Sequence, residues 1–352
     1  MKERLLALRP ILLRVFGYPL FFGFFFVTFL YVTFPYDRLK EAIIAAAEAP
    51  RVGPGGRTTP SSMLLDIQSV GPTFLPGLEL RGVTVTSLPE RPTERETRME
   101  LDRVRARISL FGLLTQHANV SLRVEGLGGE VEGDVSFFFG TLLPGLRALK
   151  LELRDLRVAD VAPLAAMVGL PLRGTMAGTV DIALPEGRTS LAEGGVQLNV
   201  SGLTLGDGRA QYQLPGFGGV TIEAIRAGNL EVRVAVRRGA AVLERVQAHS
   251  AEFDLQMDGR VDLRPNFSDS PLSLGLRFRL TDVYRNKSEV AGRIMTVMDM
   301  VPDLRRARRP DGLISYRCAG TVGRNLTCAP APGGGGTELP GGNTVMPPGF
   351  SP

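Results

Sequence analysis

The stretch LELRDLRVAD, residues 151–160, holds an apolar residue at every second position and then shifts phase by one. Leu153 belongs to the first phase and Leu156 to the second, with Asp155 at the change. Alternation of this kind is typical of a β-strand with one apolar and one solvated face. A phase change at Asp or Gly indicates a β-bulge or a tight bend within the strand.

The same interrupted strand pattern occurs at two other places in the chain. LELRGVTVTS, residues 78–87, changes phase at Gly82, and LNVSGLTLGD, residues 198–207, changes phase at Gly202. A bulge sharpens the twist of a strand while keeping its apolar side chains on one face. The repetition therefore predicts a sheet that curls several times in the same direction, with Gly82, Asp155 and Gly202 as the strand-bend hinges.

The rest of the chain also has a period of two, which predicts a mainly β fold from residue 63 to residue 328. Only two helices are expected inside this region, at about 159–169 and about 288–301, too few for a parallel sheet with crossover helices. An antiparallel sheet curled around a groove and a β-sandwich both need one apolar face. The alternation leaves both architectures open.

Residues 15–36 form a run of 22 residues without a charge. As a helix this run would be about 33 Å long, close to the thickness of a bilayer's hydrocarbon core. A cleaved signal peptide is the alternative, because AEA at 47–49 looks like a cleavage site. That site lies too far beyond the apolar run, so we expect an uncleaved transmembrane helix.

The charges around this helix predict its orientation. Residues 1–14 carry four Lys and Arg and one Glu and are expected to be a cytoplasmic basic tail. In a bacterium the remainder would be periplasmic, on a single-pass inner-membrane protein. It would comprise a juxtamembrane helix and linker at 37–62, the β-rich domain at 63–328, and a disordered Pro- and Gly-rich tail at 329–352.

Three passages resemble a known family. FPYDRLKEAI at 34–43, just outside the apolar run, and the strand–helix–strand passage at 151–187, with GLPLRGTMAGTVDI in its returning strand, are similar to the type II secretion system protein N family. The passage at 101–136, in which SLFGLL separates two strands, looks like the AsmA-type module, a distant relative of that family. The likeness covers about residues 10–328.

The resemblance implies two functions. The first is an accessory inner-membrane component of the bacterial type II secretion system, whose β-rich periplasmic domain contacts other secretion subunits. The alternative is an AsmA-like protein of the cell envelope that binds or transfers lipid, with phospholipid in an apolar groove. The two differ in whether protein covers the apolar face of the sheet.

The sequence shows no catalytic motif, and we expect no enzyme, no cofactor and no metal site. His117 and His249 lack Cys or His companions at metal-ligand spacing. Glu130, Glu132 and Asp134 alternate along one strand, so a solvated face explains them better than acid–base chemistry. The net charge of +5 includes +3 from the first fourteen residues, which argues against a nucleic-acid partner.

Two further features stand near the C-terminus. Cys318 and Cys328 are the only cysteines. An oxidising periplasm would permit a bridge between them, and the sequence leaves open whether they are bridged or free. A basic patch consists of Arg305, Arg306, Arg308 and Arg309. A solvated face is its commoner meaning, and anionic lipid head groups or an acidic partner would also suit it.

Overall fold

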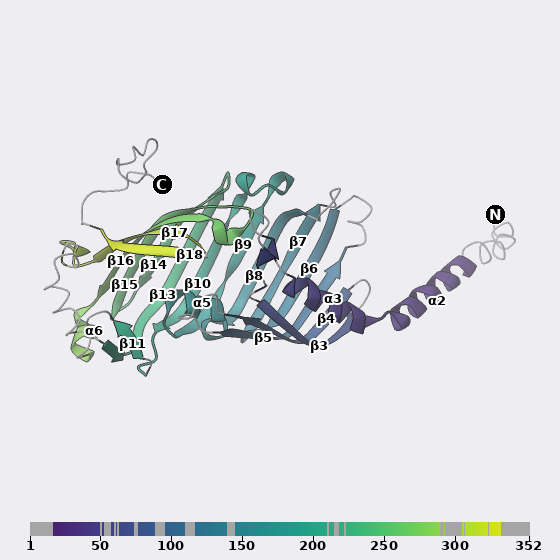
Figure 1. The fold of residues 1–352 in the computed structure, drawn as a ribbon, viewed down its shortest axis with the longest axis horizontal. Helices are drawn as coiled ribbons and strands as arrows, with labels where there is room; N and C mark the ends of the chain where they lie inside the picture. The colour runs from purple at the N-terminus through teal and green to yellow at the C-terminus, as the bar shows by residue number, and fades with distance from the viewer. Residues whose placement is uncertain are drawn as a thin grey trace, which may run out of the picture. The chain divides into compact units, whose positions relative to one another are not determined.

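A computed structural model of the chain shows a mainly β protein (Figure 1). It describes residues 17–49, 51–52, 58–59, 61, 63–73, 77–88, 96–109, 117–138, 145–209, 211–214, 218–221, 223–288, 292, 305, 307–322 and 324–331. Fourteen strands form one antiparallel sheet in the order β18-β17-β16-β15-β14-β13-β10-β9-β8-β7-β6-β5-β4-β3. The other sheets among the described residues have two strands each. The expectation of a mainly β fold with an antiparallel sheet is confirmed, and the described residues contain no second large sheet.

The chain divides into two compact units, residues 1–187 and 188–352, which are described separately. In the first unit each strand pairs with the next along the chain, as expected for a meander of hairpins. Its strands are β3 (Met63–Thr73), β4 (Gly77–Ser87), β5 (Thr97–Ile108), β6 (His117–Gly126), β7 (Gly129–Phe138), β8 (Gly145–Arg157) and β9 (Leu172–Ala183), with β1 (Arg51–Val52) and β2 (Thr58–Thr59) as a separate pair.

The second unit continues the antiparallel pattern with one interruption. Along the chain, β11 (Gln211–Leu214) and β12 (Gly218–Thr221) lie between β10 and β13 and form a two-stranded sheet of their own. In the large sheet β10 pairs directly with β13. The other strands are β10 (Glu193–Leu205), β13 (Ile225–Arg237), β14 (Ala240–His249), β15 (Phe253–Asp262), β16 (Pro271–Leu280), β17 (Ile314–Thr321) and β18 (Arg324–Pro330).

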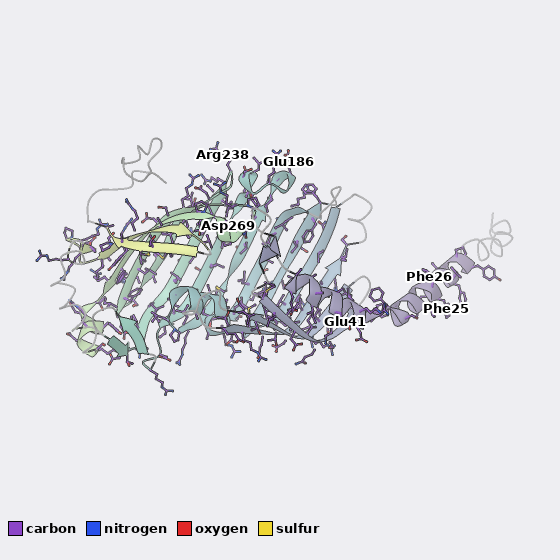
Figure 2. The ribbon with its side chains drawn as sticks, viewed as in Figure 1. Phe25, Phe26, Glu41, Glu186, Arg238 and Asp269 are labelled. Carbon is purple, nitrogen blue, oxygen red and sulfur yellow. A yellow bond between two sulfur atoms is a disulfide. The ribbon has the colours of Figure 1, made fainter. Side chains whose placement is uncertain are left out.

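Two helices precede the sheet. The apolar run appears as α2 (Tyr18–Thr33), which is followed by two non-helical residues and α3 (Tyr36–Glu48). Side chains of α2 such as Phe25 and Phe26 are more than half exposed (Figure 2). In the part of the chain that the structure describes, no helix combines the length and the apolar character that crossing a membrane would require.

The edge strand β3 is covered by α3, and the end of α2 adds one hydrogen bond to it. The backbone N–H of Leu65 donates to Glu48 Oε1 of α3 at 3.2 Å, and Tyr31 Oη of α2 donates to the Thr73 carbonyl at 2.9 Å. An unpaired strand edge is a template for adventitious pairing. The sequence places polar side chains of α2 and α3 on the free backbone groups of that edge.

Short helices connect other strands. η2 (Val158–Asp160) and α5 (Ala162–Val168) lie between β8 and β9, where a helix at about 159–169 is expected. Most of the second expected helix, at about 288–301, lies outside the described residues. The helix that the structure does show there is α6 (Asp282–Lys287), one turn earlier in the chain.

The strand-bend hinges have the backbone that a bulge requires. Asp155 and Gly202 have left-handed φ values of +53° and +63°. The pairing of β8 with β9 shifts register between Leu153 and Leu156, so two residues oppose one. An equivalent shift interrupts β10 beside β13 next to Gly202.

Gly82 is also left-handed, with φ +57°, and of the two expected features, a bulge or a tight bend, β4 has a bend without a bulge there. The pairing of β4 with β3 and with β5 passes this level without a register shift. Gln68 and Asp102 stand opposite Gly82, and both neighbouring strands change phase at the same level. The bends of β3, β4 and β5 coincide, so these three strands stay in register with one another. The extra residue lies one strand further on, because Asp102 of β5 falls at a register shift against β6.

Candidate functional site

The apolar side chains of the first unit line up across the strands. The strand register places apolar residues of neighbouring strands opposite one another. The apolar positions of the separate strands therefore form continuous rows on one face of the sheet. Three rows are Leu80–Val104–Val124–Val131–Leu153, Leu78–Ala106–Leu122–Gly133–Leu151–Val180 and Ile108–Val120–Val135–Leu149–Ile182.

These rows are only partly covered. Except for Ile108, which is exposed, their apolar side chains are half-buried, and none belongs to the buried core. The buried apolar residues of this unit lie beyond the bends or at the strand ends. Leu156, Val158, Leu172 and Met176 lie around η2 and α5, Ile67 and Val83 lie on β3 and β4, and Leu184 follows β9. Among the described elements, α3 makes extensive contact with the edge strand β3 and α5 contacts β5, and no helix makes extensive contact with β6 or β7 in the middle of the rows. The apolar face is therefore open over most of its described length.

The second unit repeats the arrangement. Its central rows are Leu198–Val232–Val246–Met257–Leu276–Tyr316 and Val196–Val234–Leu243–Gly259–Leu274–Cys318. Ten of these twelve positions are half-buried, and Val246 and Cys318 are buried. The buried residues gather at both ends of these strands: Ala192, Val236, Ala240 and Ala241 lie at one end, and Ile225, Ala227 and Phe253 lie at the other. At the second end Tyr284 of α6 is 1 % exposed and donates to the Glu223 carbonyl at 2.7 Å.

The opposite face of the first unit is a network of ion pairs. Glu79 accepts from Arg105 at 2.8 Å and from Arg81 at 2.5 Å, and Arg105 also reaches Glu125 at 3.2 Å. The hydrogen bonds from Arg105 and Arg81 lower the pKa of Glu79 against the opposing effect of its burial. Glu130 and Glu132, expected on a solvated face, belong to the same face and pair with arginines.

The described residues of the second unit include two buried carboxylates, Glu252 just before β15 and Asp254 on the polar face of β15. Asp254 lies among polar side chains of three strands. It is 8 % exposed and accepts hydrogen bonds from Arg279 and from Nδ1 of His249. Burial, the largest influence, would raise its pKa, but the bonds from Arg279 and His249 outweigh burial and the pKa is lowered. Asp254 is thus held ionised, as a structural anchor across β14, β15 and β16.

The sequence did not predict this cluster, because His249 was compared only with residues near it in the chain. His249, Asp254 and Arg279 are brought together by the pairing of their strands. A signal was present in the alternation, which places Asp254 and His249 on the polar phase of consecutive strands. The side chain of the other histidine, His117, lies outside those described. No group of three metal-ligating side chains occurs within the described ranges.

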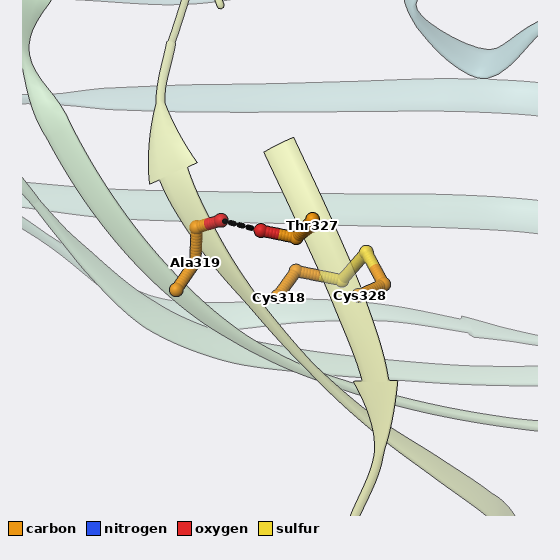
Figure 3. Close-up of a disulfide and its surroundings, with 4 residues drawn as sticks. All are labelled: Cys318, Ala319, Thr327 and Cys328. Atoms are coloured by element: carbon orange, nitrogen blue, oxygen red, sulfur yellow. Dashed lines mark hydrogen bonds between the residues drawn. A yellow bond between two sulfur atoms is a disulfide. The ribbon is translucent and has the colours of Figure 1, made fainter. Parts of the chain in front are cut away.

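The two cysteines are joined in the structure. Cys318 on β17 lies opposite Cys328 on β18, and their sulfur atoms form a disulfide (Figure 3). Beside it the Thr327 hydroxyl donates to the Ala319 carbonyl at 3.2 Å. Cys318 completes an apolar row, so the bridge ties the edge strand to the apolar face.

The basic patch is less uniform than its sequence suggests. Arg305 and Arg308 are exposed, whereas Arg309 is half-buried and its Nε lies 3.6 Å from an Asp311 carboxylate oxygen. Arg306 lies outside the described residues. The described arginines therefore do not form one free cationic surface.

A scan of protein-family models and searches of curated proteins and of solved structures find no match to this chain.

Proposed function

We propose that this protein holds the acyl chains of lipids against the open apolar face of its sheet, in the cell envelope of a bacterium. The observation that carries the proposal is the set of half-buried apolar rows, whose middle on β6 and β7 no described helix covers. A soluble protein rarely leaves a large contiguous apolar surface exposed unless a ligand, a membrane or another protein occupies it. The AsmA-type resemblance favours a lipid as the occupant.

The dimensions suit an acyl chain. The row from Leu78 to Val180 crosses six strands, which at about 4.8 Å per strand gives about 24 Å. One leaflet contributes about 15 Å of a hydrocarbon core that is about 30 Å thick. A single row is therefore longer than one acyl chain, and adjacent rows could seat a second.

The N-terminal segment would keep the protein at its lipid source. We propose residues 15–36 as an inner-membrane anchor, with the amino terminus in the cytoplasm and the sheet in the periplasm. The described part of this segment has no charged residue, and its phenylalanines are largely exposed, as for Phe22 at 72 % and Phe29 at 69 %. A periplasm-dependent reporter fused after Ala49 should be active; a mature chain beginning near residue 50 would refute the anchor.

Lipid content tests the central proposal. Leu122→Gln with Leu151→Gln places two amides in the middle of one apolar row, whereas Ser121→Gln with Glu152→Gln changes neighbouring positions on the polar face. The full chain, extracted in detergent, should lose bound phospholipid only in the first variant, as measured by mass spectrometry. Lipid held by the anchor is common to both variants. Equal lipid content in the two would contradict the proposal.

A role in type II secretion is the second candidate. It is supported by the sequence resemblance and by one structural observation: within the described residues, β18 pairs only with β17 and leaves its other edge open. A strand of another secretion subunit could extend the sheet at this edge. Charged side chains on an edge strand discourage pairing. Leu326→Lys, at a residue of β18 that is 52 % exposed, should then block subunit capture and secretion while leaving bound lipid unchanged; unaffected secretion would refute this candidate.

A further inference from the structure

The polar face of the second unit contains a hollow of about 690 Å³, within the range of about 300–1,000 Å³ typical of ligand sites. Two neighbouring cross-strand rows form it, on the face opposite the apolar rows. One end is bounded by Asp311 and Leu313, and the Asp311 carbonyl accepts from Arg279 at 3.3 Å. The polar side chains of the hollow are Asn199, Ser201, Asn229, Glu231, Gln247, His249, Asp254, Gln256 and Arg279.

The charged groups of this hollow are compensated by one another. Glu231 lies 2.8 Å from Arg233 and 3.6 Å from Arg245. Asp254 is neutralised by Arg279, as described above. A charged ligand would find no uncompensated partner among these groups.

Most of the uncharged groups are free to bind, although Asn229 Oδ1 already accepts from the Gly202 backbone N–H at 3.2 Å. Asn199, Ser201 and Gln256 make no side-chain hydrogen bond to any other described residue, and Gln247 makes only a long one, of 3.5 Å, to Glu231. Each of these amides offers two N–H donors and one acceptor oxygen. Together they form an array that can donate and accept hydrogen bonds at neighbouring positions.

The polar hollow of the first unit provides an internal comparison. Eight of its fourteen described lining residues are charged and none is an amide, whereas four of the fifteen lining the second-unit hollow are charged. The two faces share a strand architecture but differ in chemistry. The amide array is therefore a local property of the second unit and not a general consequence of a polar sheet face.

We propose that the hollow of the second unit binds an uncharged oligosaccharide. Neighbouring sugar hydroxyls both donate and accept, which matches side-chain amides that do the same. The rows cross five strands, β10 and β13–β16, so the site is about 19 Å long and suits a short chain of sugars. No aromatic residue is among the described lining residues, so no ring stacks on a sugar and we expect weak binding.

Binding can be measured on the full chain by ligand-observed NMR, in a zwitterionic detergent without a sugar head group. Maltotriose and tri-N-acetylchitotriose serve as probes, with a peptide of Ser and Gly as another uncharged hydrogen-bonding ligand. We expect saturable binding of at least one trisaccharide. The double variant Asn199→Ala with Gln256→Ala should weaken it at least about tenfold.

The matched control is Ser121→Ala with Thr179→Ala, in the hollow of the first unit, which should bind as the unaltered chain does. Failure of both trisaccharides to bind would overturn the proposal. So would equal binding by the two double variants, or binding of the peptide as tight as that of the sugars. Because the site lies opposite the apolar rows, its failure would leave the lipid proposal untouched.

Discussion

Replacing Gly202 by Val tests whether the phase changes are true left-handed bends. The φ of Gly202 is +63°, and a Cβ added there would meet no atom within 4 Å. The substitution therefore adds no collision, and its whole cost is the left-handed backbone. For a residue with a Cβ that cost is about 1–2 kcal/mol, with β-branched residues at the upper end. We expect the free energy of unfolding to fall by this amount.

Two companion variants separate backbone strain from the effect of a bulkier side chain. Gly71→Val also enters open space, but Gly71 is not among the residues with positive φ, so Val should be neutral or slightly stabilising there. Asp155→Gly should be nearly neutral, because relief of a φ of +53° offsets the greater chain entropy of glycine.

Thermal or urea unfolding of the full chain is the assay. A loss of 1 kcal/mol lowers the Tm of a domain of this size by about 2–4 °C, so Gly202→Val should lower it by about 2–8 °C. An unchanged Tm for Gly202→Val, or an equal fall for Gly71→Val, would refute the reasoning. The phase changes would then be ordinary irregularities and not bends set by the backbone.

Three further predictions concern stability. The pKa of Asp254 is lowered on folding. The stability that its ionised form contributes is therefore present above the unfolded pKa of about 3.9 and is lost as the pH falls through the lower folded value. Asp254→Asn should reduce the Tm at pH 7, and the difference in Tm between the variant and the unaltered chain should close in acid. Cys328→Ser opens a loop whose ends are 10 residues apart and should cost about 2–3 kcal/mol, with faster amide exchange confined to β17 and β18; uniform exchange would contradict this. A Cβ at Gly133 would collide with the Lys150 carbonyl, so Gly133→Ala should lose about 2 kcal/mol or more, whereas an unchanged urea midpoint would show that the strands can separate there.

Much of the fold could be predicted from the chain because strand alternation is a local signal. The mainly β character, the helix after the apolar run and the left-handed hinges at Asp155 and Gly202 all follow from spacing and residue type. The joint bend at Gly82 could not, since it depends on which strands lie beside β4. Each neighbouring strand changes phase at its own point, and only register shows that Gln68 and Asp102 share one level.

The candidate sites depend even more on pairing. Apolar rows such as that through Leu122 and Leu151 exist because β6, β7 and β8 align in register, and a sandwich would have given the same alternation with the face covered. The cluster at Asp254 joins residues from three strands. The spacing of residues along the chain does not show which residues lie side by side on neighbouring strands. The individual residues could therefore be identified from the sequence, but their association could not.

The most direct test of the account places a photo-cross-linking amino acid at Leu122, in the middle of an open apolar row. The matched position is Ser121, one residue earlier and on the opposite face. After irradiation of intact cells and purification of the full chain, mass spectrometry should find phospholipid adducts at 122 and not at 121. Protein-only adducts at 122, or equal lipid labelling at both positions, would contradict the claim that the apolar face holds lipid.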